Sequence, residues 1–324
     1  MAKPAGSLES SRRGLAPRRG AIHGEPLFRA AVALAALLVL GTVLGLAALL
    51  TYKSWSSIRT FGGGFLVNQT WDPIHKQFGA LPDIYGTLVT SAMAIVLASF
   101  IGVGAALCLT DLAPRRIAGT LSALVELLAA IPSVVYGLWG IFVLAPLLRE
   151  YVEPFLHHTL GFVPIFSGPE IGIGLFAGGI ILAIMILPTV TAISRDVIRA
   201  VPLEQREAAA GLGATHWEIM WKVVLPYARP GIIGALILGL GRALGETIAV
   251  TMVVGARPQI THELFGLGYT IAAVIANEFA EATYNLYLSA LFELGLVLLL
   301  ITMLLNILAR LLIWRVSRGP AGAL

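Results

Sequence analysis

The chain has 324 residues, of which 57% are hydrophobic and only 12% are charged. Soluble domains average about 45–50% apolar and about 25% charged residues, so this composition leaves too few polar side chains to cover a water-facing surface. It excludes an ordinary soluble enzyme, a disordered chain and a solvent-exposed nucleic-acid binder. The apolar residues also form long uninterrupted blocks, which is typical of a polytopic membrane protein.

Six apolar blocks follow a basic N-terminal segment. Residues 1–29 are rich in Arg, Gly, Ser and Pro and lack apolar periodicity, so we expect a disordered tail. A helix needs about 20 residues to cross about 30 Å of hydrocarbon, and five of the blocks fit a single crossing each. The third block contains Pro132 and Pro146 and is longer, so it is either one bent helix or a broken pair. The predicted blocks are 30–51, 84–110, 117–148, 170–194, 231–254 and 286–309.

The basic residues predict the orientation. With six spans and a cytoplasmic N-terminus, 16 of the 22 Lys and Arg residues lie inside and five lie outside. Cytoplasmic loops favour Lys and Arg, so both termini are predicted in the cytoplasm. The net charge of +4 therefore reflects topology and predicts no nucleic-acid partner. We divide the chain into a basic cytoplasmic tail (1–29), a first span with its outer loop (30–83), a core of five spans (84–314) and a second cytoplasmic tail (315–324).

The only long, polar inner loop covers residues 195–230. Pro202 suits the first position of a helix, and Gly213 suits the position just after the end of that helix. Thr215 and Glu218 then have the spacing of a capping box, which starts a second helix. We expect this second helix to end near Val224, before the next proline. The loop is therefore predicted to be a helix, a glycine turn and a second helix beneath the membrane.

The same loop carries a longer pattern. Glu207-Ala208-Ala209, Gly213 and Val223-x-Leu225-Pro226 follow the spacing E-A-A-x(3)-G-x(9)-I-x-L-P, with Val223 in place of Ile. This resembles the EAA motif of ABC importer permeases. The resemblance implies an all-α, MetI-like permease fold with six transmembrane helices. It also implies that the loop couples to a cytoplasmic ATPase through Glu207, Ala208, Ala209, Gly213, Leu225 and Pro226.

Four ionisable residues lie within the predicted spans, namely Glu126, Arg242, Glu246 and Glu293. Each costs about 2.5–3.5 kcal/mol at the centre of a bilayer, so each is a functional candidate. If the fifth span begins at Gly231, Arg242 lies roughly 17 Å along it, close to the midplane. Glu246 is expected one turn further out, on the same face.

Two interpretations of this pair remain open from the residues alone. Arg242 and Glu246 could form an internal ion pair that permits insertion. Alternatively, Arg242 could offer its planar fork of donors to a tetrahedral oxyanion, with Glu246 orienting it. Small residues at Ala235 and Gly239, and at Gly241 and Gly245, predict close approach of other helices beside the charged face.

The stretch from Gly241 to Thr247 (GRALGET) resembles permeases of the bacterial phosphate-specific transport system, as does the stretch from Glu126 to Gly137 (ELLAAIPSVVYG). The likeness covers roughly residues 84–314. It implies that Arg242, Glu246, Glu126 and Thr247 take part in moving phosphate through the membrane. One feature fits this poorly, because one Arg against three Glu sums to −2. Glu126 or Glu293 is then protonated, paired with a partner subunit or turned away from the path.

The chain has no G-x-x-x-x-G-K-[ST] loop, so we expect no ATPase site, no bound cofactor and no enzymatic activity of its own. No histidine lies in a predicted span, and we predict no catalytic or metal site. The resemblance implies a multi-pass protein of the bacterial inner (plasma) membrane, surrounded by membrane lipid. Its implied partners are a second homologous permease, a dimer of ATP-hydrolysing subunits and a periplasmic or lipid-anchored phosphate-binding protein. The alternatives are a permease for sulfate or molybdate, and a stand-alone secondary anion transporter or channel.

Overall fold

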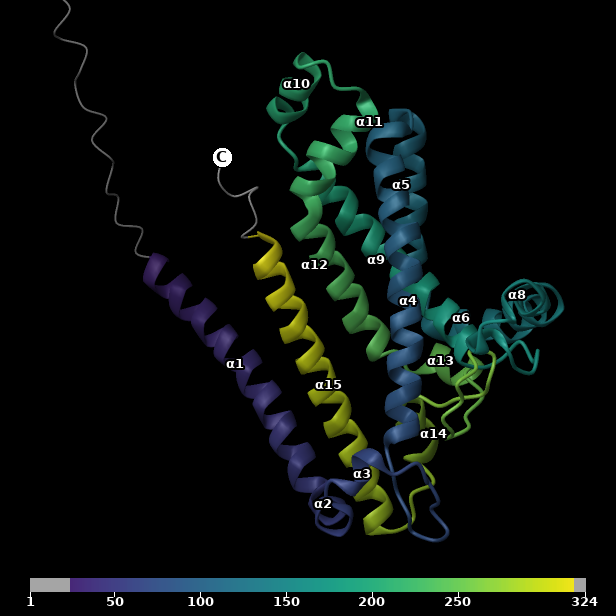
Figure 1. The fold of residues 1–324 in the computed structure, drawn as a ribbon. Helices are drawn as coiled ribbons and strands as arrows, with labels where there is room; N and C mark the ends of the chain where they lie inside the picture. The colour runs from purple at the N-terminus through teal and green to yellow at the C-terminus, as the bar shows by residue number, and fades with distance from the viewer. Residues whose placement is uncertain (1–23, 318–324) are drawn as a thin grey trace, which may run out of the picture. The chain divides into compact units, whose positions relative to one another are not determined.

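A computed structural model describes residues 24–317. This part of the chain is helical (Figure 1), and six of its helical segments have the length and apolar composition of a membrane span. The predicted all-α class and the number of six spans are therefore confirmed. The chain divides into residues 1–48 and residues 49–324, which are described separately. The spans are Phe28–Lys53, Leu81–Leu112, Ser133–Leu160, Leu175–Arg199, His216–Leu244 and Asn285–Arg315.

Helix α1 (Gly24–Lys53) contains the first span. Residues 24–29 were predicted as the end of a disordered tail. They are helical because the helix of the apolar run that follows extends back over them. The rest of that predicted tail (1–23) and residues 318–324 lie outside the described residues. The most apolar stretch of α1 has no buried residue. A helix of this length and apolar composition suits a lipid environment.

The segments that follow α1 pack against the start of the last span, α15 (Asn285–Ser317). Phe65, Trp71 and Phe78 are buried beside Tyr287 of that helix. Glu278 ends a short outer helix and accepts hydrogen bonds from Nε1 of Trp71 at 2.6 Å and from the hydroxyl of Tyr287 at 2.7 Å. These contacts hold the outer segments against α15. Its helices are α2 (Trp55–Phe61), α3 (Gly64–Val67) and α14 (Ile271–Glu278).

Three long helices form the centre of the fold, α4 (Leu81–Leu107), α9 (Leu175–Arg199) and α12 (Leu225–Leu244). A β-carbon at Gly102 of α4 would lie 3.0 Å from Val190 of α9, and one at Gly239 of α12 would also lie 3.0 Å from Val190. The two glycines let both helices approach α9 closely. Helix α9 is thus the element on which α4 and α12 pack.

The third predicted block, 117–148, is broken rather than bent. Helix α5 (Arg115–Ala129) ends before Pro132, which is the N-cap of α6 (Ser133–Trp139). A residue before proline is disfavoured in the helical conformation, which favours a break there. The third span begins at Ser133, so the break leaves six spans. It continues through η2 (Gly140–Leu144), α7 (Ala145–Leu147), η3 (Leu148–Val152) and α8 (Glu153–Leu160).

The fifth span begins much earlier than predicted, at His216, and ends at Leu244 instead of residue 254. Its cytoplasmic part is continuous with α12, so the inner loop between spans is shorter than residues 195–230. The short helix α13 (Ile248–Val253) follows after a break. The remaining elements on this side and in the outer loops are η1 (Cys108–Leu112), α10 (Leu203–Gly211), α11 (His216–Ile219), η5 (Met220–Val224) and η4 (Pro164–Phe166).

Candidate functional site

Arg242 lies at mid-depth in the bundle. Gly239, one turn before it, faces Val190 and Ile186 in the middle of the long helix α9. This contact places Arg242 level with the middle of α9, although Arg242 lies two residues before the end of the fifth span and not midway along it as predicted, because that span begins at His216 instead of Gly231. Its side chain is exposed in the single chain, and within residues 24–317 no ion pair includes it. The guanidinium is therefore available to a ligand or to another subunit.

Glu246 does not continue the helix that carries Arg242. Helix α12 ends at Leu244, and Glu246 lies in a break before α13. Its Oε1 accepts a hydrogen bond from the backbone N–H of Ala249 at 3.3 Å, in the first turn of α13. The prediction of one continuous face, with Glu246 one turn beyond Arg242, is therefore wrong. The carboxylate caps the next helix because the first N–H groups of a helix lack partners within it.

Thr247 stabilises the same break. Its hydroxyl donates to the backbone oxygen of Gly245 at 3.2 Å, and its backbone oxygen accepts from the Thr251 hydroxyl at 2.7 Å. A non-helical stretch at membrane depth is tolerated where it is buried in protein or lines a cavity. Arg242, Glu246 and Thr247 are thus brought to one discontinuity of the fifth span.

A second helix break lies beside the first. Gly137 of α6 is in close contact with Ala249 of α13, so the helix that follows the α5–α6 break packs on the helix that follows the α12–α13 break. The Tyr136 hydroxyl donates to the oxygen of Leu128 at 2.8 Å, across the first break. Tyr136 is therefore an additional candidate at this pair of breaks. A tyrosine within an apolar run gives no distinctive sequence signal.

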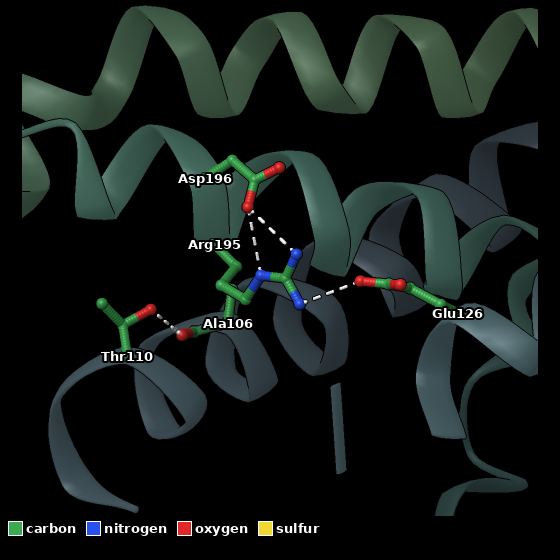
Figure 2. Close-up of polar contacts among 5 residues, drawn as sticks. All are labelled: Ala106, Thr110, Glu126, Arg195 and Asp196. Carbon is green, nitrogen blue, oxygen red and sulfur yellow. Dashed lines mark hydrogen bonds and ion pairs between the residues drawn. The ribbon is translucent and has the colours of Figure 1, made fainter. Parts of the chain in front are cut away.

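Glu126 lies elsewhere. Its Oε1 is 3.1 Å from Nη1 of Arg195, close to the cytoplasmic end of α9, and Figure 2 shows the Arg195 guanidinium between Glu126 and Asp196. Arg195 is nine residues from Ile186, or roughly 13 Å along α9 from the level of Arg242. The structure therefore does not bring Glu126 to Arg242. This separation accounts for part of the excess negative charge predicted along the spans.

The fourth embedded residue, Glu293, also lies apart from the helix break. It is buried in α15 and faces Ser57 of the outer helix α2. Neighbouring Ser289 accepts the N–H of Ser57 at 3.0 Å and donates to the oxygen of Lys53 at 2.8 Å. Glu293 therefore belongs to the joint between α2 and α15, and Glu246 is the one embedded carboxylate at the break beside Arg242.

The cytoplasmic loop has the predicted glycine turn. Gly213 has φ +85°, and its N–H donates to the oxygen of Ala210 at 2.9 Å, while Ala214 N–H donates to Ala209 at 3.1 Å. These two bonds define a Schellman motif, in which a residue with positive φ ends the helix. Glu207 and Ala208 are exposed on α10, and Pro202 is the N-cap of α10 instead of its first residue.

The second helix starts as predicted but does not end as predicted. The Thr215 hydroxyl accepts the N–H of Glu218 at 3.3 Å, and Glu218 accepts the N–H of Thr215 at 3.0 Å, which completes the capping box. The helix then runs through the wide turn η5 into α12, past Leu225 and Pro226. A π-helical turn adds a residue to the repeat and accommodates the missing N–H of the proline. The loop therefore joins α12 through one uninterrupted helical segment.

Large apolar side chains on this loop are left uncovered. Leu212, beside the glycine turn, is 90% exposed, and Trp217 and Trp221 are also exposed. A shallow groove between α10 and the following helix is lined by Ala209, Gly213 and Lys222, among others. Exposed apolar groups of this size mark a contact surface for another protein or for the bilayer interface. The alanine and glycine pattern in the sequence pointed to this loop as a functional segment. It did not predict that Leu212 is exposed, because that exposure depends on the conformation of the turn at Gly213.

The comparison with known proteins identifies the family. Residues 98–318 match the family described as binding-protein-dependent transport system inner membrane component. This chain belongs to that family. It is 47% identical to the phosphate transport system permease protein PstC of Mesorhizobium japonicum, over 90% of this chain and 91% of the relative. It is 46% identical to the protein of the same name from Pasteurella multocida, over 91% of this chain and 93% of the relative.

Solved structures show the same fold. A chain of the MetNI methionine ABC transporter in an inward-facing conformation superposes with a TM-score of 0.54 at 20% identity, covering 73% of this chain and 95% of that chain. A chain of a bacterial alginate ABC transporter superposes with a TM-score of 0.61 at 16% identity, covering 91% of this chain and 98% of that chain. The expected MetI-like ABC permease fold is therefore confirmed. The chain is a multi-pass membrane permease subunit.

Proposed function

We propose that this chain is a permease subunit of an ATP-driven importer that moves inorganic phosphate into the cell across a bacterial inner membrane. The observation that carries the proposal is Arg242, an arginine without an ion-pair partner in residues 24–317, at mid-depth beside two broken helices. Binding sites formed where spans are interrupted are common in membrane transporters. The names of the relatives at 46–47% identity support phosphate as the transported ion.

The chemistry of Arg242 suits a transient anion site. A guanidinium presents parallel N–H donors that match two oxygens of a tetrahedral oxyanion. Glu246 stands near it but is held by the Ala249 N–H, so it restrains the local positive charge without neutralising Arg242 directly. Import requires that the ion be bound and then released, so a carboxylate that keeps Arg242 from binding the ion too tightly suits transport. Thr247 and Tyr136 add hydroxyl groups at the two helix breaks.

The assembly that we propose follows from the surfaces left open. A β-carbon added at Gly241 would meet no atom within 4 Å, whereas Ala235 on the packed side of α12 is fully buried. The open small-residue face suits close packing of a second, homologous permease, which would close a path around Arg242. The exposed Leu212 and the EAA segment suit a dimer of cytoplasmic ATPase subunits, which would use the ATP. A periplasmic or lipid-anchored binding protein would deliver phosphate to the outer loops.

The test is transport by the complex reconstituted in liposomes with its ATPase, second permease and binding protein. We expect ATP-dependent uptake of labelled phosphate in preference to labelled sulfate and molybdate. Preferential uptake of sulfate or molybdate would show that the transported ion is that oxyanion and not phosphate. Phosphate uptake that continues without the ATPase subunits would indicate a stand-alone secondary transporter or channel.

A further inference from the structure

Arg206, within the ATPase-facing helix α10, connects that helix to two spans. Its Nη1 lies 2.6 Å from Oδ1 of Asp111, in η1 at the cytoplasmic end of α4. Its Nη2 donates to the backbone oxygen of Ile198, in the last turn of α9, at 2.8 Å. One guanidinium therefore joins three segments, and the partners are 95 and 8 residues away in the chain.

This contact is partly removed from water. The Asp111 side chain is 7% exposed and the Arg206 side chain 20% exposed. Ile198 and the neighbouring Ala106 are fully buried in a cytoplasmic cluster, which we define as Ala106, Ile198, Val201, Met220, Val224, Ala228 and Ile232. The other oxygen of Asp111 has no hydrogen-bond partner within the described residues. Asp111 thus depends on Arg206, because an ionised carboxylate in a poorly hydrated place needs a compensating charge.

Apolar packing contributes little to the position of α10. None of its nine residues is buried, and the cytoplasmic cluster contains no residue of this helix. Its ends are fixed covalently, by the link to α9 at one end and by the Schellman turn to α11 at the other. Those two links connect α10 with α9 and, through the continuous helix, with α12. Neither of them reaches α4.

We propose that Arg206 is a positioning residue for transport, which transmits movements of α10 to α4 through Asp111. This inference rests on the proposed function, since it assumes that an ATPase moves α10. Helix α4 packs along α9, which in turn packs on α12 near Arg242. Packing along their length already links α4 to α9. The ion pair adds a direct link from α10 to the cytoplasmic end of α4, so that the cytoplasmic ends of all three helices move as one group.

The experiment compares variants in the reconstituted complex, with ATP hydrolysis and phosphate uptake measured on the same liposomes. The variants are Arg206→Gln, Asp111→Asn and the double variant. Arg206→Lys keeps the charge but lacks the two planar N–H groups that let a guanidinium bond Asp111 and Ile198 at the same time. The matched control is Arg199→Gln, since Arg199 is an exposed arginine at the same end of α9. The amount of assembled complex is measured for each variant.

We expect Arg206→Gln and Asp111→Asn each to lower the phosphate transported per ATP hydrolysed by about tenfold, a difference of about 1.4 kcal/mol, because movements of α10 would no longer reach α4 through Asp111. Hydrolysis itself and assembly should stay close to those of the unaltered complex. The double variant should be no worse than either single variant, and Arg206→Lys should recover only part of the loss. Arg199→Gln should leave the ratio unchanged.

Two results would overturn the inference. One is an unchanged ratio of transport to hydrolysis in Arg206→Gln. The other is a loss of uptake that follows the loss of assembled complex, or that is additive in the double variant, because both would indicate only a structural role. The proposed function is judged separately, since its failure would appear in the unaltered complex as an absence of ATP-driven phosphate uptake.

Discussion

Arg195 Nη1 and Glu126 Oε1 lie 3.1 Å apart, and this pair links the end of α9 to α5 (Figure 2). Arg195 is also bonded to Asp196 at 3.0 Å. Glu126 therefore lies near the cytoplasmic face, away from Arg242 and the helix break that follows it. The structure therefore separates Glu126 from Arg242, although the family resemblance implied that both take part in moving phosphate.

Arg242→Gln is expected to reduce phosphate uptake by roughly 100-fold, because bonds to a charged group contribute up to about 3 kcal/mol. Assembly and thermal stability should be unaffected, since the side chain is exposed in the single chain and its removal leaves no buried partner. Uptake by reconstituted complexes and size-exclusion profiles check the two expectations. Arg229→Gln, on the cytoplasmic end of the same helix, is the control. Normal uptake by Arg242→Gln would refute the role of this arginine.

Glu126→Gln is expected to change uptake by less than about threefold, because a pair with one exposed partner contributes about 0–1 kcal/mol. The Glu126 side chain is 57% exposed, while Arg195 keeps its bond to Asp196. Initial uptake rates measured beside those of Arg242→Gln give the comparison. If the two variants lost uptake equally, the role in translocation implied by the family resemblance would hold for Glu126.

Gly213→Ala is expected to destabilise the turn by about 1–2 kcal/mol, since a side chain disfavours the left-handed conformation. No other atom lies within 4 Å of the added carbon, so the cost is conformational rather than a clash. Gly213→Asn should cost less, because asparagine adopts positive φ more readily. Binding of the ATPase subunits to membranes carrying each variant measures the difference. Equal weakening by Ala and Asn would contradict this explanation.

The outer cluster around Glu278 predicts a dependence of stability on pH. Burial raises the pKa of Glu278 above its ordinary value of 4.5, despite the hydrogen bonds from Tyr287 and Trp71 that favour the carboxylate. The folded protein therefore holds this proton more tightly than the unfolded chain. Stability is largest below the ordinary pKa and falls as the pH rises through the raised value.

Glu278→Gln tests this, because both donors bond the same oxygen, Oε2, and an amide oxygen can accept them. The difference in melting temperature between the two proteins should grow in favour of the glutamine variant from about pH 4 to about pH 7. Melting curves in lipid nanodiscs across this range provide the measurement. A difference that does not vary with pH would show that Glu278 titrates as in the unfolded chain.

Local features of the sequence determined the six spans and the helix, glycine turn and second helix of the inner loop. Apolar length predicts a span, and the positions of Gly213, Thr215 and Glu218 predict their turn and cap, since the groups involved are within a few residues of one another. The same reasoning placed Arg242 midway along a span that begins at Gly231, whereas the span runs from His216 to Leu244. This local reasoning failed at Leu225 and Pro226. The proline predicted the end of a helix there, but a π-helical turn lets the helix continue.

Tertiary structure decided the rest. The break before Glu246 follows no proline, and it forms where α13 packs on α6. Arg206 meets Asp111 across 95 residues, and Arg195 meets Glu126 across 69. The partner of a long charged side chain depends on which helix ends the packing brings together, and no local rule contains that information. The sequence thus determined which residues are costly in a membrane, and only the packed bundle decided how each of them is compensated.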